Sequence, residues 1–253
     1  MKLIRLFSAI LPAMIMISGC QDNSNTDEKL NQAFNNARSG DWKSAAKIAA
    51  EISEKYPQAV QPMLIQALAF EKNGELDKAI DLARHAADAA PKDFTAQYTY
   101  GRLCSLTPRR QAEAFSVLEN ALKLKPEDAD TLVLLCSIGI NRNEPSTDQY
   151  LNLLTHNQAF SRSAELYFML GARQAQKGNR DASKRFMMDA LNKCGGSRNP
   201  DFYYHIAKCF DRNRFPLNEV KNRYAFYLRI RGKKNPEYVA AAGKRLLQLK
   251  SSR

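Results

Sequence analysis

Residues 40–57 read GDWKSAAKIAAEISEKYP, and residues 74–91 read GELDKAIDLARHAADAAP. The second stretch repeats the first at a period of 34 residues, which aligns three pairs of small or helix-ending residues: Gly40 with Gly74, Ala45 with Ala79, and Pro57 with Pro91. Glycine tolerates the positive φ of a tight turn, and proline ends a helix because it lacks an amide hydrogen. Alanine lets two helices pack closely at their crossing. The pattern therefore predicts a turn followed by a helix, repeated along the chain.

A 34-residue period resembles the tetratricopeptide repeat (TPR) family, in which each unit is a pair of antiparallel helices. The resemblance implies an all-α fold, a right-handed superhelical solenoid of about six TPR-like helix–turn–helix units with a C-terminal capping helix. Long helical periodicity agrees with this class, whereas a generic helical bundle would not repeat Gly, Ala and Pro at a fixed period. The units are expected at 26–59, 60–93, 94–128, 129–161 (degenerate), 164–197 and 199–232, with the cap at 235–250.

The amino terminus has the pattern of an export signal. Basic Lys2 and Arg5 precede an apolar run at 6–17, which is shorter than the roughly 20 residues that a membrane-spanning helix needs. The run ends in Ile17-Ser18-Gly19-Cys20, which resembles the lipobox of bacterial lipoproteins. The resemblance implies a signal peptide at 1–19, a lipidated Cys20 with a polar tether at 20–27, and the solenoid at 28–253. An ordinary secretory signal or an uncleaved anchor is the alternative.

The same resemblance predicts the location. Several acyl chains hold a protein stably on a membrane, so the mature chain is expected to be lipid-anchored in the bacterial cell envelope. In proteobacterial lipoproteins an Asp directly after the Cys retains the protein in the inner membrane. Residue 21 is Gln, which favours the periplasmic face of the outer membrane, although Asp22 follows it.

The TPR resemblance also implies a peptide-binding groove. In that family the fifth and ninth residues of each first helix point into a concave groove, and here these positions begin with Leu30. The candidates carried over are Phe34, Leu64, Leu68, Tyr98, Arg102, Phe168, Tyr204 and Lys208. One TPR subclass binds a terminal carboxylate with Lys and Asn at these positions, and the apolar residues of the early units do not match it. An apolar and aromatic groove suits a peptide with apolar anchors, while packing in the core is the alternative role.

Charge is unevenly distributed. Residues 21–197 contain 22 basic and 22 acidic side chains, whereas 198–253 contain 14 basic and 4 acidic ones, a net charge of +10. The densest basic cluster is Arg229, Arg231, Lys233 and Lys234, and together with Lys221 and Arg223 upstream it makes up a basic patch. It is expected to be a solvated helix face or a surface for an acidic protein or an anionic membrane. Nucleic acid is not expected as a partner of an exported lipoprotein.

No catalytic motif is recognisable. The three histidines are scattered, without metal-ligand spacing, and neither a phosphate-binding Gly-rich loop nor a nucleophile elbow occurs. No enzymatic activity, cofactor, metal or small-molecule substrate is therefore expected. Four cysteines remain after the lipobox, and in an exported protein they could oxidise. They are expected to be buried small residues, with a Cys104–Cys136 bridge as the alternative: Cys104, Cys136, Cys194 and Cys209.

Together these features predict a membrane-anchored TPR scaffold or adaptor that mediates protein–protein interactions in the envelope. Two kinds of lipoprotein share lipidation, length and tandem TPRs: the TPR lipoprotein of the outer-membrane barrel-assembly complex and the type IV pilus pilotin. No motif selects between them. The alternative is that the basic C-terminal region binds an acidic protein or an anionic membrane, with the repeats as a structural spacer.

Overall fold

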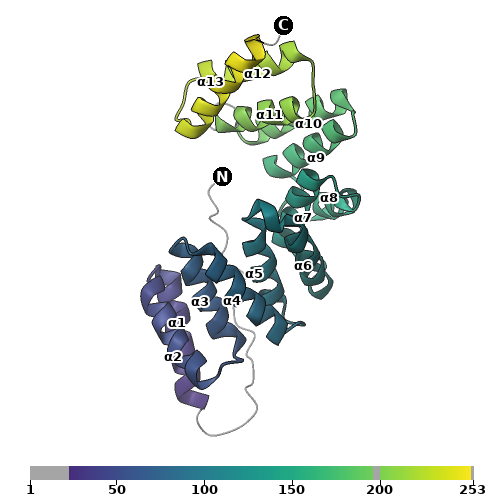
Figure 1. The fold of residues 1–253 in the computed structure, drawn as a ribbon. Helices are drawn as coiled ribbons and strands as arrows, with labels where there is room; N and C mark the ends of the chain where they lie inside the picture. The colour runs from purple at the N-terminus through teal and green to yellow at the C-terminus, as the bar shows by residue number, and fades with distance from the viewer. Residues whose placement is uncertain (1–22, 196–199, 252–253) are drawn as a thin grey trace. The chain divides into compact units, whose positions relative to one another are not determined.

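The structure is a computed structural model that describes residues 23–195 and 200–251. The expected signal peptide and the lipidation site Cys20 lie outside the described residues. Within those residues the chain forms thirteen α-helices and one short 3₁₀ helix, and no strand (Figure 1). The helices follow one another in antiparallel pairs, which confirms the predicted all-α, TPR-like solenoid. The chain divides into two compact units, 1–131 and 132–253.

The first unit contains three helix pairs and the first turn of a fourth. The helices are α1 (Asn23–Ser39) and α2 (Trp42–Lys55), α3 (Val60–Lys72) and α4 (Leu76–Ala89), and α5 (Phe94–Ser105) and α6 (Gln111–Leu124), with the 3₁₀ helix η1 (Pro108–Arg110) before α6. The first helices α1, α3 and α5 also contact one another in order. Consecutive pairs therefore stack on each other within this unit.

Glycines form the turns inside the pairs. Gly40 and Gly74 have φ of 88° and 81°, the left-handed region that side chains with a Cβ rarely adopt. Asp41 donates its backbone N–H to the carbonyl of Asn36 at 2.8 Å, as expected when a glycine ends a helix in a Schellman motif. A Cβ at either glycine would meet nothing within 4 Å, so backbone conformation and not space selects glycine there.

Small residues lie where the two helices of a pair cross. Ala45 and Ala79 are fully buried on the second helices of their pairs. Gly101 on α5 is more constrained, because a Cβ there would lie 2.7 Å from Cγ of Leu118 on α6. The crossings thus leave no room for larger side chains, as the repeat pattern implies.

The second unit begins within α7 (Ala129–Arg142) and runs to the end of the chain. Its other helices are α8 (Thr147–His156), α9 (Ala164–Gln176), α10 (Arg180–Lys193), α11 (Asp201–Arg212), α12 (Leu217–Arg229) and α13 (Pro236–Ser251). At 10 residues α8 is the shortest α-helix described, and Asn143 just before it has a φ of 58°. Arg173 on α9 joins this region by donating to Asp148 at 2.8 Å and to Asn143 at 2.8 Å.

Polar contacts fasten the last helix to the pair before it. Arg245 of α13 donates to both carboxylate oxygens of Asp211 on α11, at 2.7 and 2.8 Å. The hydroxyl of Tyr227 on α12 donates to Asp201 at 2.9 Å, and the backbone N–H of Asn235 donates to the same carboxylate at 3.1 Å. Arg245 thus joins α13 to α11, while Asp201 joins α11 to α12 and to the residue that precedes α13. Ala242 and Leu249 of α13 belong to the apolar core of the second unit.

Candidate functional site

The groove candidates of the first unit lie on the three consecutive first helices. Leu64 is buried, and Phe34, Leu68 and Tyr98 are half-buried. Tyr98 stacks on Phe94 with ring centroids 5.7 Å apart. The half-buried side chains keep part of their apolar surface accessible, whereas Leu64 belongs to the core.

Arg102, the last of the candidates on these three helices, forms an ion pair within the protein. Its two Nη atoms donate to the two carboxylate oxygens of Glu71 at 2.8 and 2.7 Å, in a bidentate ion pair between α5 and α3. Burial by itself would raise the pKa of Glu71, but the hydrogen bonds and charge of Arg102 hold that pKa below its usual value. Arg102 therefore fastens consecutive first helices together.

The groove candidates of the second unit are in different environments. The ring of Phe168 packs edge-on against Phe202, with centroids 5.4 Å apart. Tyr204 is buried in an aromatic cluster, stacked on Tyr238 at 4.6 Å. Lys208 is exposed. These candidates therefore do not form one continuous apolar surface.

The structure also separates the members of the basic patch. Arg231 and Lys233 are exposed in the segment between α12 and α13. Lys234 donates to the carbonyl of Leu228 at 2.9 Å and is therefore held by the backbone. The remaining members, Lys221, Arg223 and Arg229, lie on α12. Two of these, Arg223 and Arg229, line a hollow that the sequence pattern did not indicate.

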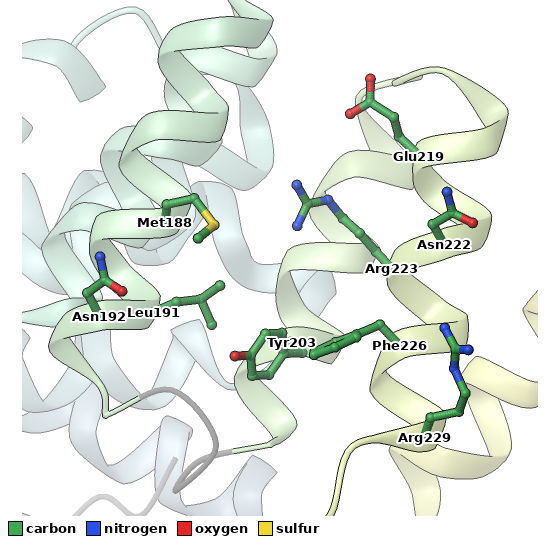
Figure 2. Close-up of a pocket in the computed structure, with 9 residues that line it drawn as sticks. All are labelled: Met188, Leu191, Asn192, Tyr203, Glu219, Asn222, Arg223, Phe226 and Arg229. Atoms are coloured by element: carbon green, nitrogen blue, oxygen red, sulfur yellow. The ribbon is translucent and has the colours of Figure 1, made fainter.

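This hollow has a volume of about 560 Å³ and lies within the second unit, between α10 and α12, with α11 behind it. Figure 2 shows Met188 and Leu191 of α10 facing Arg223 of α12 across it, with the ring of Tyr203 beside that of Phe226. The centroids of these two rings are 5.1 Å apart. Its lining residues are Met188, Leu191, Asn192, Tyr203, Glu219, Asn222, Arg223, Phe226 and Arg229.

The electrostatics of the hollow favour an anion. Arg223 stacks its guanidinium over the ring of Phe210, 4.0 Å from the centroid, and makes no ion pair with any described residue. Burial lowers the pKa of Arg223 below its usual range, and the charge of Glu219 opposes this shift only in part. Glu219, the one carboxylate in the lining, is itself paired with Lys184 of α10 at 2.9 Å. The hollow therefore presents an uncompensated positive charge beside apolar side chains.

Other kinds of site are not found in the described part of the chain. No group of three or more His, Cys, Asp or Glu side chains there is placed to hold a metal ion. No helix among 23–195 and 200–251 is both long and apolar enough to cross a membrane. All four described cysteines are free thiols, and burial raises the pKa of Cys104 to about 11, of Cys136 to about 12 and of Cys209 to about 11. These three thiols therefore stay protonated and unreactive near neutral pH.

Solved structures with similar folds are TPR-like. The protein MamA matches with a TM-score of 0.57 and 18% identity over 67% of this chain and 92% of its own. MamA of Desulfovibrio magneticus RS-1, residues 41 to the end, matches with a TM-score of 0.57 and 16% identity over 69% of this chain and 97% of its own. YrrB, described as a TPR protein with an unusual peptide-binding site, matches with a TM-score of 0.55 and 18% identity over 79% of this chain and 99% of its own. The fold is that of the TPR proteins. No family model matches the chain, and no curated protein matches it by sequence.

The sequence did contain one signal for the hollow. Met188 and Phe226 lie on second helices, where apolar residues are expected to face the core, yet they are 50% and 45% exposed. A helical projection could have placed them outside the buried stripe. It could not have shown that they come from helices two apart in the chain and face one cavity.

Proposed function

We propose that this protein is a membrane-anchored TPR scaffold that binds protein partners in the bacterial envelope. The observation that carries the proposal is the row of half-buried apolar side chains on the stacked first helices of the first unit, Phe34, Leu68 and Tyr98. Such side chains gain contact area with a partner at little conformational cost and are typical anchors of peptide grooves. YrrB, which shares the fold, is described as having a peptide-binding site. The proposed role is binding, without catalysis.

The anchor is supported by the lipobox-like sequence Ile17-Ser18-Gly19-Cys20. Cells labelled with radioactive palmitate are expected to yield a labelled protein of this size. The Cys20→Ser variant should be expressed but unlabelled. Fractionation of inner and outer membranes then tests the expected outer-membrane location. Label that persists in the Cys20→Ser variant, or no label in either protein, would show that Cys20 is not acylated.

The binding surface is tested by photo-crosslinking in intact cells. A benzophenone side chain at Leu68, on the first-helix face, should form adducts with a partner, and one at Asp88 is the matched control. Asp88 lies exposed on α4, a second helix of the same unit. Adducts from position 68 should disappear in the Phe34→Ala, Tyr98→Ala double variant. Adducts of equal yield from both positions would contradict a groove on the first helices.

The identity of the crosslinked partner separates the two envelope roles. Capture of a secretin subunit would support a pilotin-like role, and capture of a barrel-assembly component would support the other. The alternative in which the basic C-terminal region is the binding surface has its own structural basis, namely the hollow on α10 and α12.

A further inference from the structure

Arg223 lies at the centre of the hollow and has no carboxylate to pair with. Its guanidinium is held against the Phe210 ring, 4.0 Å from the centroid, and is directed toward Met188 (Figure 2). The nearest acid in the lining, Glu219, is engaged by Lys184. Unpaired charges that are partly removed from water are costly, and a bidentate carboxylate is the partner that best matches a guanidinium. The two buried arginines, Arg102 and Arg173, both have such a carboxylate within the protein, whereas the half-buried Arg223 has none among the described residues.

The walls around Arg223 are apolar and accessible. Met188 and Phe226 expose about half of their surfaces, and Leu191 forms the buried floor between them. Methionine adapts its shape to different ligands, and aromatic rings are common anchors at interfaces. The amides of Asn192 and Asn222 stand at the rim and make no side-chain hydrogen bond to a described residue. They can pair with the backbone of an extended segment.

We propose that the hollow between α10 and α12 binds a short acidic segment of a protein partner. A carboxylate of that segment pairs with Arg223, and an adjacent apolar side chain packs against Met188, Leu191 and Phe226. This inference rests on the proposed scaffold function but concerns a different surface, formed mainly by the second helices α10 and α12, and it names the chemistry of the partner.

Charge complementarity supports this occupant. Six of the nine lining residues, those on α11 and α12, belong to the part of the chain that carries a net charge of +10, residues 198–253, and Arg229 adds a second cation to the lining. A field of this sign raises the rate at which acidic partners associate. A volume of about 560 Å³ is enough for a few side chains. A flat anionic membrane would contact exposed cations such as Arg231, and it would leave the apolar floor and the rim amides unused.

The direct test is fluorescence anisotropy with the full-length chain in mild detergent. The probe is a short fluorescein-labelled peptide in which Asp and Glu alternate with Leu and Phe, made as the free acid and as the C-terminal amide. Control peptides replace the acids by Asn and Gln, or the apolar residues by Ser. We expect the acidic, apolar peptide to bind and both control peptides to bind at least about tenfold more weakly. A tenfold change in the dissociation constant corresponds to about 1.4 kcal/mol of binding free energy. Binding of the free acid alone would assign the carboxylate to a chain terminus.

The matched variants are Arg223→Gln and Arg231→Gln, which remove the same charge inside and outside the hollow. Arg223→Gln should weaken binding by about tenfold or more, because it removes the partner of a partly desolvated carboxylate, whereas Arg231→Gln should change it by less than about twofold. Met188→Glu is a second variant, on a half-exposed side chain, that should abolish binding without affecting the fold. Circular dichroism confirms that each variant is folded.

Three results would overturn the inference. They are absence of binding by the wild type, equal affinity of the wild type and both hollow variants, and binding only to vesicles of phosphatidylglycerol and phosphatidylethanolamine. The in-cell adducts from position 68 do not depend on the hollow. If the otherwise wild-type protein forms no adducts from position 68 but still binds the peptide, the first-helix groove alone is refuted. If it forms those adducts but does not bind the peptide, the hollow alone is refuted.

Discussion

Replacing Gly101 by Ala should destabilise the first unit, although alanine is the better helix former. Gly101 lies inside α5, where the higher helix propensity of alanine would contribute about 1 kcal/mol. A Cβ at this position, however, would lie 2.7 Å from Cγ and 2.9 Å from Cδ2 of Leu118, and 3.3 Å from the backbone nitrogen of that residue. Leu118 is fully buried, so any movement away from the new methyl group would be toward other protein atoms.

The two contributions can be compared in size. Overpacking a core by one methyl group costs about 1–3 kcal/mol, and the backbone contact to α6 places this site toward the upper end. The net destabilisation is therefore about 1–2 kcal/mol. With a urea dependence of about 2 kcal/mol per molar for a unit of this size, the midpoint of unfolding should fall by about 0.5–1 M.

The assay is urea unfolding followed by tryptophan fluorescence. Trp42 is the only tryptophan of the chain and packs at the core of the first unit, so its emission reports on that unit. Gly243→Ala is the control, followed by circular dichroism. Gly243 lies within α13, where an added Cβ would meet nothing within 4 Å, so alanine there should stabilise the second unit by about 0.5–1 kcal/mol. A midpoint for Gly101→Ala equal to or above that of the wild type would refute the steric argument.

Three further predictions concern two ion pairs and the cysteine thiols. Because the folded-state pKa of Glu71 is lowered, its pair with Arg102 stabilises the protein above the unfolded pKa and loses this contribution as pH falls through the folded pKa. Glu71→Gln should lower the free energy of unfolding by about 1–3 kcal/mol at pH 7 and by much less near pH 3. Urea unfolding at both pH values measures the two differences, and equal differences would contradict the pairing. Asp211→Asn should weaken the bidentate bond from Arg245 and expose α13 to faster cleavage by trypsin, with cleavage in α2 unchanged. In a Cys20→Ser background one thiol, the half-buried Cys194, should react with Ellman's reagent before unfolding, and fast reaction of a second would contradict the burial of Cys104, Cys136 and Cys209.

The turns and crossings of the fold could be predicted from the sequence because they depend on single residues in local conformations. A positive φ requires glycine at positions 40 and 74 whatever surrounds them, and a close crossing requires a small residue at positions 45 and 79. These requirements recur in each helix pair, so they appear in the sequence as a period of 34 residues. The helical class and the pairing of helices follow from them.

The surfaces could not be predicted in the same way, because a repeat position does not determine what lies against it. Tyr98 and Tyr204 occupy equivalent positions, yet one is half-buried on α5 and the other is buried in an aromatic cluster. Arg102 occupies a groove position by its place in the repeat, but its guanidinium pairs with Glu71, 31 residues earlier in the chain. Such pairings depend on how consecutive helix pairs stack on one another.

The sequence by itself determined the repeat, the helical class, the lipobox-like start and the concentration of basic residues after position 197. Only the tertiary structure decided which of those basic residues act together. Arg223 and Arg231 are close in sequence, but Arg223 is stacked on Phe210 and faces Met188, while Arg231 is exposed between two helices. The physical reason is that charge is a property of composition, whereas an unpaired guanidinium beside an apolar wall is created by the packing of α10, α11 and α12.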